Sequence, residues 1–478
     1  MTRREKRKIG LFCLTASAVL LLLCSQCSPL YPINVWGDAN CLLTVGRVMK
    51  AGGVVYRDIY EQKGPTLYLL HMIAACMSDS SFLGVYVLEA LSFAAALCLA
   101  CRMMLRRMSA RAACALSALL GACVLIGGAF SRGDSAEEFC LQYLMAALTL
   151  TFEEYGQHPG PMRKGALFVC GLMAGMVATI KFTILGLFVG LCIAEGVLAL
   201  RSGGIRRALM SAGVFLAGML LPVLLWSAYF AAHGALGDMY TAYIHNNIFL
   251  YSDGARTAMD VLHDVWDAVR DNALWVLAAA GGLLALLMDR QERLSLRLAV
   301  LCMAACAFAA VFLLGRTWPY SPLALAVFAF VGPGRRLGRL LDRRAAGAAA
   351  CALALAIALL LSPNAYLRGE DRENLAQTRL ARYVHEGATL LQYSHLDDGL
   401  YLTTGTMPQQ KYFVRLNVHC EEMLAELDRY VAEAIPDYVL TAWEPLDAEF
   451  DRYQLIATDA GYDDRDRINK LLYLYRRK

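Results

Sequence analysis

The chain has 478 residues, of which 58% are hydrophobic and only 18% are charged. This composition excludes an ordinary soluble protein and indicates several helical passages through a bilayer. The formal net charge is only +4 and the basic residues are spread over short loops, so the sequence predicts no nucleic-acid partner.

The first predicted element is a membrane span over residues 9–30, which follows the basic segment MTRREKRK. A basic start before an apolar run is also typical of a secretory signal peptide, and a lipoprotein-type cut before Cys24 or Cys27 is a further alternative. We favour an uncleaved span, because many more apolar runs follow it along the chain.

Residues 35–75 alternate charged and apolar side chains at helical spacing, which a simple connection between two spans does not require. We therefore expect surface helices in this first outer loop. Asp38 is a candidate general base, a candidate metal ligand or a helix N-cap. Lys63 precedes Gly64-Pro65, where a helix begins, and it is either a phosphate ligand or a lysine that snorkels to the membrane interface.

Ten further apolar runs approach the length of about 20 residues that a bilayer core requires, which gives eleven predicted spans in all. These runs cover residues 82–101, 112–130, 139–152, 165–180, 183–200, 208–231, 272–288, 298–315, 319–332 and 345–361.

Lys and Arg collect on the cytoplasmic side of membrane proteins. With eleven spans and a cytoplasmic N-terminus, the basic loops 102–111, 201–207, 289–297 and 333–344 all lie inside. Merging residues 165–200 into one span would move the last two of these loops outside. The sequence therefore predicts two short spans with a turn near Lys181 at the outer face.

The second outer loop, SRGDSAEEF (131–139), carries further candidates. Glu137 and Glu138 stand in the first turn of a helix, where acids are favourable with the helix dipole; base catalysis or metal binding opposite the Asp38 loop is the functional alternative. Arg132 can neutralise these acids or bind phosphate. Lys181 lies between apolar helices, a costly position that favours a ligand role, with snorkelling as the alternative.

Two polar-aromatic clusters, HNN (245–247) and RTWPY (316–320), are of the kind that bind sugars or lipid head groups. Anchoring of aromatic side chains at the membrane interface is the alternative interpretation. The predicted substrate-binding residues are Asp58, Glu61, His245, Arg316 and Tyr320.

From residue 363 the chain becomes rich in charge and in turn signals. LLQYS, DYVLTAW, YQLIAT and KLLYLY predict short strands, and ENLAQTRLARYVHEG and HCEEMLAELDRYVAEA predict amphipathic helices. We expect a membrane domain, 1–362, and a small extracytoplasmic α/β domain, 363–478. Most of the 16 cysteines lie inside apolar runs and act as small hydrophobes, so we predict neither a disulfide framework nor a zinc site.

Taken in order, four segments resemble the GT-C class of membrane glycosyltransferases, in particular the protein O-mannosyltransferases and the lipid A aminoarabinose transferases. They are WGDAN after the first span, YRDIYEQKGPTLYLL, RGDSAEEF and GLMAGMVATIKFTIL. The resemblance covers nearly the whole chain and implies a base at Asp38 and a lipid-phosphate contact at Lys63. The chain departs from the class in two ways: Gly64 separates Lys63 from the proline, and a lone acid follows the first span where some relatives have an acidic pair.

The resemblance implies inverting transfer of a sugar from a polyprenyl-phosphate donor to a hydroxyl of a glycan, lipid or protein acceptor at the outer face. Lys63, Lys181 or Arg132 would stabilise the leaving phosphate, and Asp38, Glu137 and Glu138 are the catalytic candidates. A divalent metal is a candidate cofactor, since some members of the class need one and others do not.

A transporter, or a polysaccharide polymerase or ligase that handles lipid-linked sugars, is the alternative function. A transporter places ionisable residues at mid-membrane and often has repeated halves. Here the ionisable residues gather at one face of the predicted bundle and the halves do not look alike. The sequence thus predicts a multi-pass enzyme of the cell membrane with a GT-C-like fold.

Overall fold

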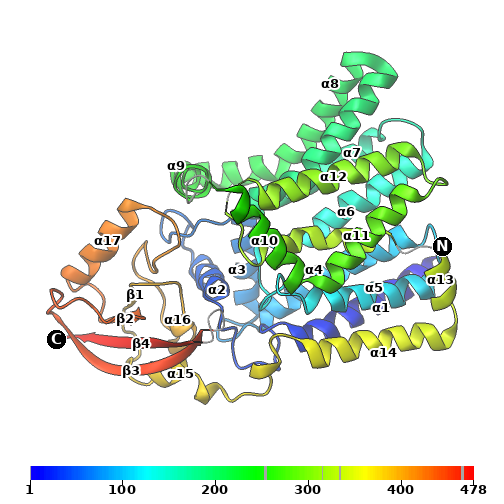
Figure 1. Cartoon of the computed structure of the whole chain (residues 1–478). Coiled ribbons are helices and arrows are strands. Elements are labelled where there is room, and N and C mark those ends of the chain that lie inside the picture. The colour runs from blue at the N-terminus through cyan, green and yellow to red at the C-terminus, as the bar shows by residue number, and fades with distance from the viewer. Residues whose placement is uncertain (1, 252–255, 315, 333–334, 464–467) are drawn as a thin grey trace. The chain divides into compact units, whose positions relative to one another are not determined.

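The computed structural model describes residues 2–251, 256–314, 316–332, 335–463 and 468–478 (Figure 1). They form two compact units, each built from three separate stretches of the chain. The first unit comprises residues 1–25, 87–228 and 253–365, and the second comprises 26–86, 229–252 and 366–478. The division expected after residue 362 stays a prediction, but residues 366–478 share their unit with residues 26–86.

The first unit is helical. Its helices are α1 (Arg3–Cys24), α4 (Leu83–Met104), α5 (Ala110–Leu125), α6 (Ala136–Gln157), α7 (Lys164–Lys181), η1 (Phe182–Leu185), α8 (Gly186–Ala232), α10 (Ala258–Asp271), α11 (Ala273–Met288), α12 (Leu294–Phe312), η3 (Ser321–Phe330), α13 (Arg335–Leu341) and α14 (Arg344–Leu361). Helices α4 and α8 each continue by a few residues into the second unit.

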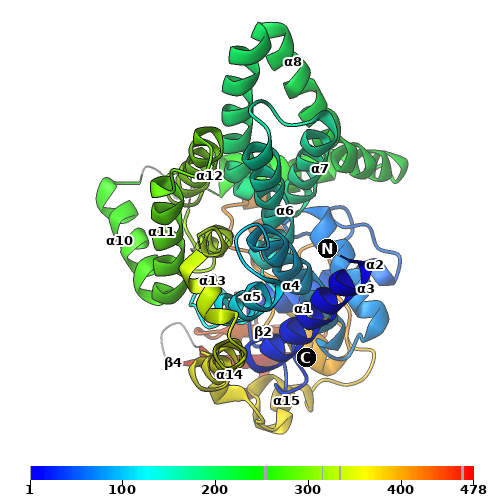
Figure 2. The same cartoon turned by 90° about the vertical axis from the view of Figure 1, so that its right-hand side faces the viewer.

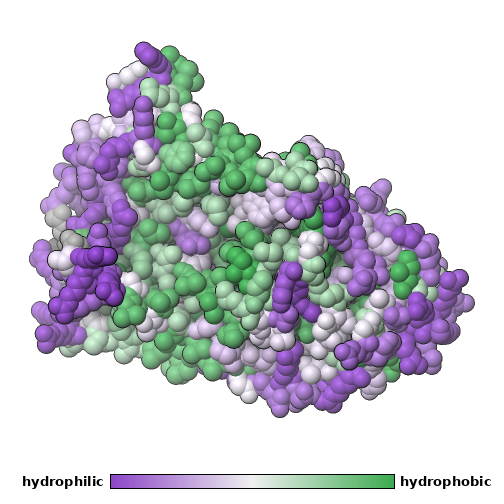
Figure 3. Space-filling view, turned by 180° about the vertical axis from the view of Figure 1, so that it is seen from behind, coloured by the Kyte–Doolittle hydropathy of each residue, from purple (hydrophilic) through white to green (hydrophobic). Residues whose placement is uncertain are grey.

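Apolar side chains cover much of the flank of the first unit, as Figure 3 shows. Leu11, Leu225 and Leu277 are 67%, 65% and 67% exposed. A soluble protein rarely exposes so continuous an apolar surface, whereas lipid acyl chains accept it. The protein is therefore a polytopic integral membrane protein.

Five helical segments of the described chain are long and apolar enough to cross a membrane, or six if the bent pair α10–α11 counts as one span. One of the five, Lys164–Ala232, has 69 residues. A straight helix of that length would measure about 100 Å, against roughly 30 Å for a bilayer core, so it must turn back. The total of eleven spans stays a prediction.

Two breaks divide this long segment, one near Lys181 and one within residues 201–207, where the sequence predicts a turn and a loop. Helix α7 ends at Lys181 and the 3₁₀-helix η1 follows it. Within α8 the backbone leaves helical geometry at Gly203 and Gly204, and Gly204 has φ +67°, a conformation that favours glycine. Figure 2 shows α8 as two arms that meet at a sharp turn. The predicted span over 319–332 contains the ten-residue 3₁₀-helix η3, and residues 333–334 lie outside the described part of the chain.

The second unit contains helices and a four-stranded sheet. Its elements are α2 (Gly37–Lys50), α3 (Pro65–Met77), α9 (Leu236–Met239), the π-helix η2 (Tyr240–Leu250), η4 (Ala365–Leu367, at the boundary), η5 (Arg372–Asn374), α15 (Ala376–Ala381), β1 (Leu390–Gln392), α16 (Leu400–Thr404), α17 (Glu421–Ala432), β2 (Tyr438–Ala442), β3 (Tyr453–Asp463) and β4 (Ile468–Arg477). The strand order is β1-β2-β4-β3; β1 and β2 are parallel, and β4 pairs antiparallel with β2 and with β3.

Most residues of helix α2 are buried, and its expected place against the membrane surface stays a prediction. The Arg47 guanidinium donates to the carbonyl oxygens of Tyr401 and Gly405, each at 3.0 Å. The Thr44 hydroxyl donates to Asp397 at 2.8 Å. The polar residues that alternate along this helix therefore hold it to the C-terminal segment, a use that sequence periodicity alone does not reveal.

A buried ion cluster fastens β4 to the segment after β1. Asp398 accepts from Lys470 Nζ at 2.5 Å and contacts the His395 ring. Burial alone would raise the pKa of Asp398, but His395 and Lys470 outweigh it and hold that pKa well below its usual range. The folded state thus favours the ionised carboxylate more strongly than the unfolded chain does.

We expect Asp398→Asn to lower the stability of the second unit by about 3 kcal/mol at pH 7, since it leaves a buried lysine without its partner. A depressed carboxyl pKa contributes stability above the unfolded pKa near 4, and this contribution is lost as the pH falls. Thermal unfolding of the detergent-purified protein should therefore show a midpoint that falls below pH 5 more steeply for the wild type than for the variant. Glu433→Gln, which removes an exposed partner of Arg429, should change little.

Candidate functional site

The first site residues meet where α2 and α3 begin. Asp38 lies in the first turn of α2, whose N-cap is Trp36, so Asp38 is not itself the cap. Lys63 lies just before α3, which has Gly64 as its N-cap and Pro65 at its first position. Lys63 Nζ lies 3.5 Å from a carboxylate oxygen of Asp38. The structure thus joins the predicted base to the predicted phosphate ligand.

Glu61 fixes the position of Lys63 through hydrogen bonds. Its carboxylate accepts from Lys63 Nζ at 3.1 Å and from the Lys63 backbone N–H at 3.0 Å. The Tyr68 hydroxyl donates to Glu61 and accepts from the Lys63 N–H at 2.8 Å. The Tyr56 hydroxyl donates to the Lys63 carbonyl at 2.6 Å. Both the backbone and the side chain of this lysine are therefore fixed.

Exposure separates the three charged side chains. Those of Asp38 and Lys63 remain 13% and 14% exposed, whereas that of Glu61 is only 1% exposed. Burial alone would lower the pKa of Lys63, but Asp38 and Glu61 outweigh it and raise that pKa above its usual range. Lys63 therefore presents a permanent positive charge with a carboxylate beside it, while Glu61 supports it.

The HNN segment lies in the π-helix η2, a rare conformation that often marks functional sites. Asn246 donates to the Tyr60 hydroxyl at 2.7 Å, and Asn247 donates to the Gln62 carbonyl at 2.6 Å. Tyr60 and Gln62 are the sequence neighbours of Glu61, so these two bonds fix the loop that carries Glu61. His245 is half-buried, with Nδ1 at 3.2 Å from Asn246 Oδ1.

Asp58 is engaged with its own neighbours instead. It pairs with Arg57 at 2.7 Å and accepts from the Val54 N–H at 2.8 Å. Its side chain is 38% exposed. These contacts close the turn between α2 and Lys63, and the substrate-binding role expected for Asp58 stays a prediction.

The first unit brings a second group of predicted residues together. Lys181, at the end of α7, pairs through Nζ with Glu137 at 2.6 Å. The same Nζ lies 5.0 Å from the centre of the Tyr320 ring, close enough for a cation–π contact. Glu137 is 1% exposed and Lys181 is 22% exposed at their side chains, so the lysine is the member that reaches the surface.

The RTWPY segment extends this group outward. The Arg316 guanidinium lies 4.1 Å from the Trp318 ring centre, and the Trp318 and Tyr320 rings are parallel within 2° at 6.2 Å. Arg316 is exposed and Tyr320 is buried. The arrangement alternates cations with aromatic faces, a surface that suits an anionic or sugar-bearing ligand.

Glu138 does not share the contact of Glu137 with Lys181 but bonds the backbone of Asp134. Its carboxylate and that of Glu89 both accept from the Asp134 N–H, at 2.9 and 2.8 Å. Glu89 also accepts from the Ser25 hydroxyl at 2.8 Å. A Cβ at Gly133 would lie 2.5 Å from Glu89 and from Ser25, so only glycine allows this approach. Arg132, beside it, is 8% exposed.

Sequence reasoning missed Glu89, Tyr68 and Tyr60. Glu89 has a signal, since it is a carboxylate inside an apolar run. The two tyrosines have none, because tyrosine near a membrane interface is common. Among the residues that the structure describes, no group of three or more His, Cys, Asp or Glu side chains is placed to hold a metal ion.

The sequence matches no protein-family model and no curated protein. Solved structures, in contrast, are similar over 97% of this chain and 97% of theirs. One is ArnT from Cupriavidus metallidurans bound to undecaprenyl phosphate, with a TM-score of 0.66 at 13% identity. The second is the same ArnT in the apo state, with a TM-score of 0.62 at 14% identity.

The chain has the GT-C fold. This finding confirms the fold expected from the four resembling segments, because ArnT is a lipid A aminoarabinose transferase of that class. At 13% identity a shared GT-C fold does not carry residue roles with it. The roles of Asp38, Lys63 and the other candidates must come from the contacts described above.

Proposed function

We propose that the protein is a GT-C glycosyltransferase that moves a sugar from a polyprenyl-phosphate donor to an acceptor hydroxyl at the outer face of the membrane. The observation that carries this proposal is the pairing of Asp38 with Lys63 at 3.5 Å, with both side chains partly exposed. A fixed cation can stabilise a phosphate that leaves, and a carboxylate beside it can take a proton from the attacking hydroxyl.

In the proposed reaction, Lys63 faces the donor phosphate. The acceptor oxygen attacks the anomeric carbon from the side opposite the phosphate, and the bond between that carbon and the phosphate oxygen breaks. The phosphate leaves with the bonding electron pair and gains stabilisation from the Lys63 ammonium. Asp38 takes the proton of the attacking hydroxyl. Because the attack comes from the side opposite the leaving phosphate, the configuration at the anomeric carbon inverts.

Glu61 acts through Lys63 in this proposal. Because it bonds both the backbone N–H and Nζ of that lysine, it sets the direction in which the ammonium points. Glu61 is thus a positioning residue rather than the substrate ligand that the sequence suggests. The contacts of Asn246 and Asn247 to the flanking residues support the same loop.

The group around Lys181 in the first unit offers a second cation beside a carboxylate. Lys181 lies over the Tyr320 ring and Arg316 over the Trp318 ring, and we propose that they bind the donor's phosphate or sugar. The ArnT structure that shares this fold was solved with undecaprenyl phosphate, which supports a donor of that chemical class.

The test is a transfer assay on the purified protein in lipid nanodiscs. Radiolabelled polyprenyl-phosphate sugar should yield polyprenyl phosphate and glycosylated acceptor in equal amounts, with inverted anomeric configuration. Movement of intact labelled lipid across vesicles without bond cleavage would instead indicate a transporter. Transfer of preassembled glycans in preference to single sugars would indicate a ligase or polymerase.

A further inference from the structure

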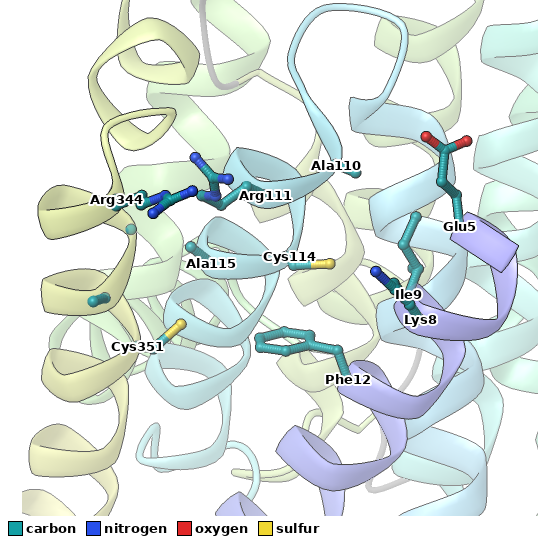
Figure 4. A pocket seen from close by; sticks show the side chains of 12 residues that line it. Glu5, Lys8, Ile9, Phe12, Ala110, Arg111, Cys114, Ala115, Arg344 and Cys351 are labelled. Carbon is teal, nitrogen blue, oxygen red and sulfur yellow. The ribbon is translucent and has the colours of Figure 1, made fainter.

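A cavity of about 460 Å³ opens within the first unit, among the N-terminal ends of α1, α5 and α14 (Figure 4). The three helices pack against one another. The cavity involves neither Lys181 nor Glu137. Its volume lies in the range of small-molecule sites, which invites the question of what it binds.

Three cations line the cavity, one from each helix: Lys8, Arg111 and Arg344. All three are exposed. Among the described residues, Lys8 and Arg344 make no side-chain hydrogen bond or ion pair, and Arg111 donates only to the Asp342 carbonyl, at 2.9 Å. Three basic side chains from three helices in one lining favour an anionic ligand.

Two acids lie close to these cations: Glu5, which lines the cavity, and Asp342, whose carbonyl accepts from Arg111. The Glu5 carboxylate accepts from the Thr2 N–H at 2.7 Å and completes the capping box of α1. Asp342 accepts from the Ser109 hydroxyl. Glu5 lines the cavity and interacts electrostatically with Lys8, so it offsets part of the positive charge. Among the described residues of the lining it is the one carboxylate beside three cations, so the cavity keeps a net positive charge.

Helix geometry adds to this charge. Helices α1, α5 and α14 all begin at this end, so the positive ends of three helix dipoles meet there. The N-cap of α14 is Arg343, which makes no side-chain capping bond, so the first backbone N–H groups of α14 lack a side-chain cap. Such groups commonly bind phosphate.

The inner part of the cavity is apolar. Figure 4 shows Arg111 and Arg344 at one end and the Phe12 ring farther in, together with Cys114 and Cys351. Helices α1 and α14 are both long and apolar enough to cross a membrane. A ligand with a charged head and an apolar tail matches this division, whereas a free anion would use only one end.

We propose that this cavity binds an anionic glycerophospholipid of the leaflet that faces the basic helix ends. The phosphate lies among Lys8, Arg111 and Arg344, and an acyl chain lies over Phe12 and Cys351. Basic pockets between membrane helices on the cytoplasmic side bind acidic lipid head groups in this way. The site is separate from the proposed transfer chemistry, and its occupant serves the fold rather than the reaction.

Native mass spectrometry of the detergent-purified protein tests this assignment. Phosphatidylglycerol should be retained on the wild type in preference to phosphatidylcholine, undecaprenyl phosphate and inorganic phosphate. Lys8→Gln and Arg344→Gln should each weaken retention of phosphatidylglycerol about fivefold, and the double variant about 25-fold. Arg344→Lys should keep most of it.

Arg343→Gln is the matched control, because Arg343 is the exposed neighbour of Arg344 and does not line the cavity. It should leave retention unchanged. Equal retention of phosphatidylcholine by the wild type, or an equal loss with Arg343→Gln, would overturn the proposal. Preference for undecaprenyl phosphate would assign the cavity to the donor lipid instead, and retention of inorganic phosphate alone would assign it to a free anion. The comparison of lipids on the wild-type protein tests the proposal even if a variant fails to fold.

Discussion

Asp38→Asn should lower kcat for sugar transfer by about 10²–10⁴-fold, the usual contribution of a general base. The amide keeps the size of the side chain and its place in the first turn of α2 but accepts no proton at neutral pH. Lys63 remains charged and remains held by Glu61, so the donor should still bind. Initial rates at saturating donor measure the loss, and binding of labelled donor measures what is kept.

A second comparison separates this role from a structural one. If Asp38 only orients Lys63, its replacement should weaken donor binding as much as it slows transfer, and Lys63→Gln should show the same pattern. If Asp38 is the base, donor affinity should stay within about threefold of the wild type. Asp79→Asn provides the matched control, because Asp79 is an exposed acid of the same unit that pairs with Lys50 at 2.8 Å. Activity of Asp38→Asn equal to that of Asp79→Asn would contradict the assignment.

The sequence could predict which charged residues matter because their chemistry is local. An acid or a lysine next to an apolar run can be recognised from the sequence whatever the fold is. This criterion identifies Asp38, Lys63, Glu137 and Lys181. It could also predict a turn after Lys181, since the basic loops require one. The structure pairs these four residues as Asp38 with Lys63 and Glu137 with Lys181.

Contacts between distant segments could not be predicted in the same way. The bond between Thr44 and Asp397 spans more than 350 positions, and neither residue is unusual in its own neighbourhood. Tyr60 and Asn246 lie far apart in the sequence as well, and although the HNN segment is conspicuous, nothing local pairs it with Tyr60. Periodicity shows that α2 is amphipathic, but it does not show which segment of the chain covers the polar face of this helix.

Lys181→Met should lower the stability of the first unit by about 3–5 kcal/mol, because it leaves Glu137 charged, buried and without its partner. The thermal unfolding midpoint of the purified protein measures the effect. Lys164→Met is the matched control, since Lys164 lies on the same helix but at its exposed N-terminal end. It should change the midpoint little. Equal midpoints for the two variants would show that the ion pair contributes no net stability.

Stability alone cannot tell whether Lys181 also serves the reaction, but exchanging the charges can. In the double variant Lys181→Glu with Glu137→Lys, the ion pair re-forms with opposite polarity and should recover much of the lost stability. The exposed member of the pair is then a carboxylate, which repels the donor phosphate. Transfer should therefore remain low although the protein is folded. Recovery of transfer together with stability would mean that the pair only stabilises the packing of α6 against α7 and that Lys181 has no part in the reaction.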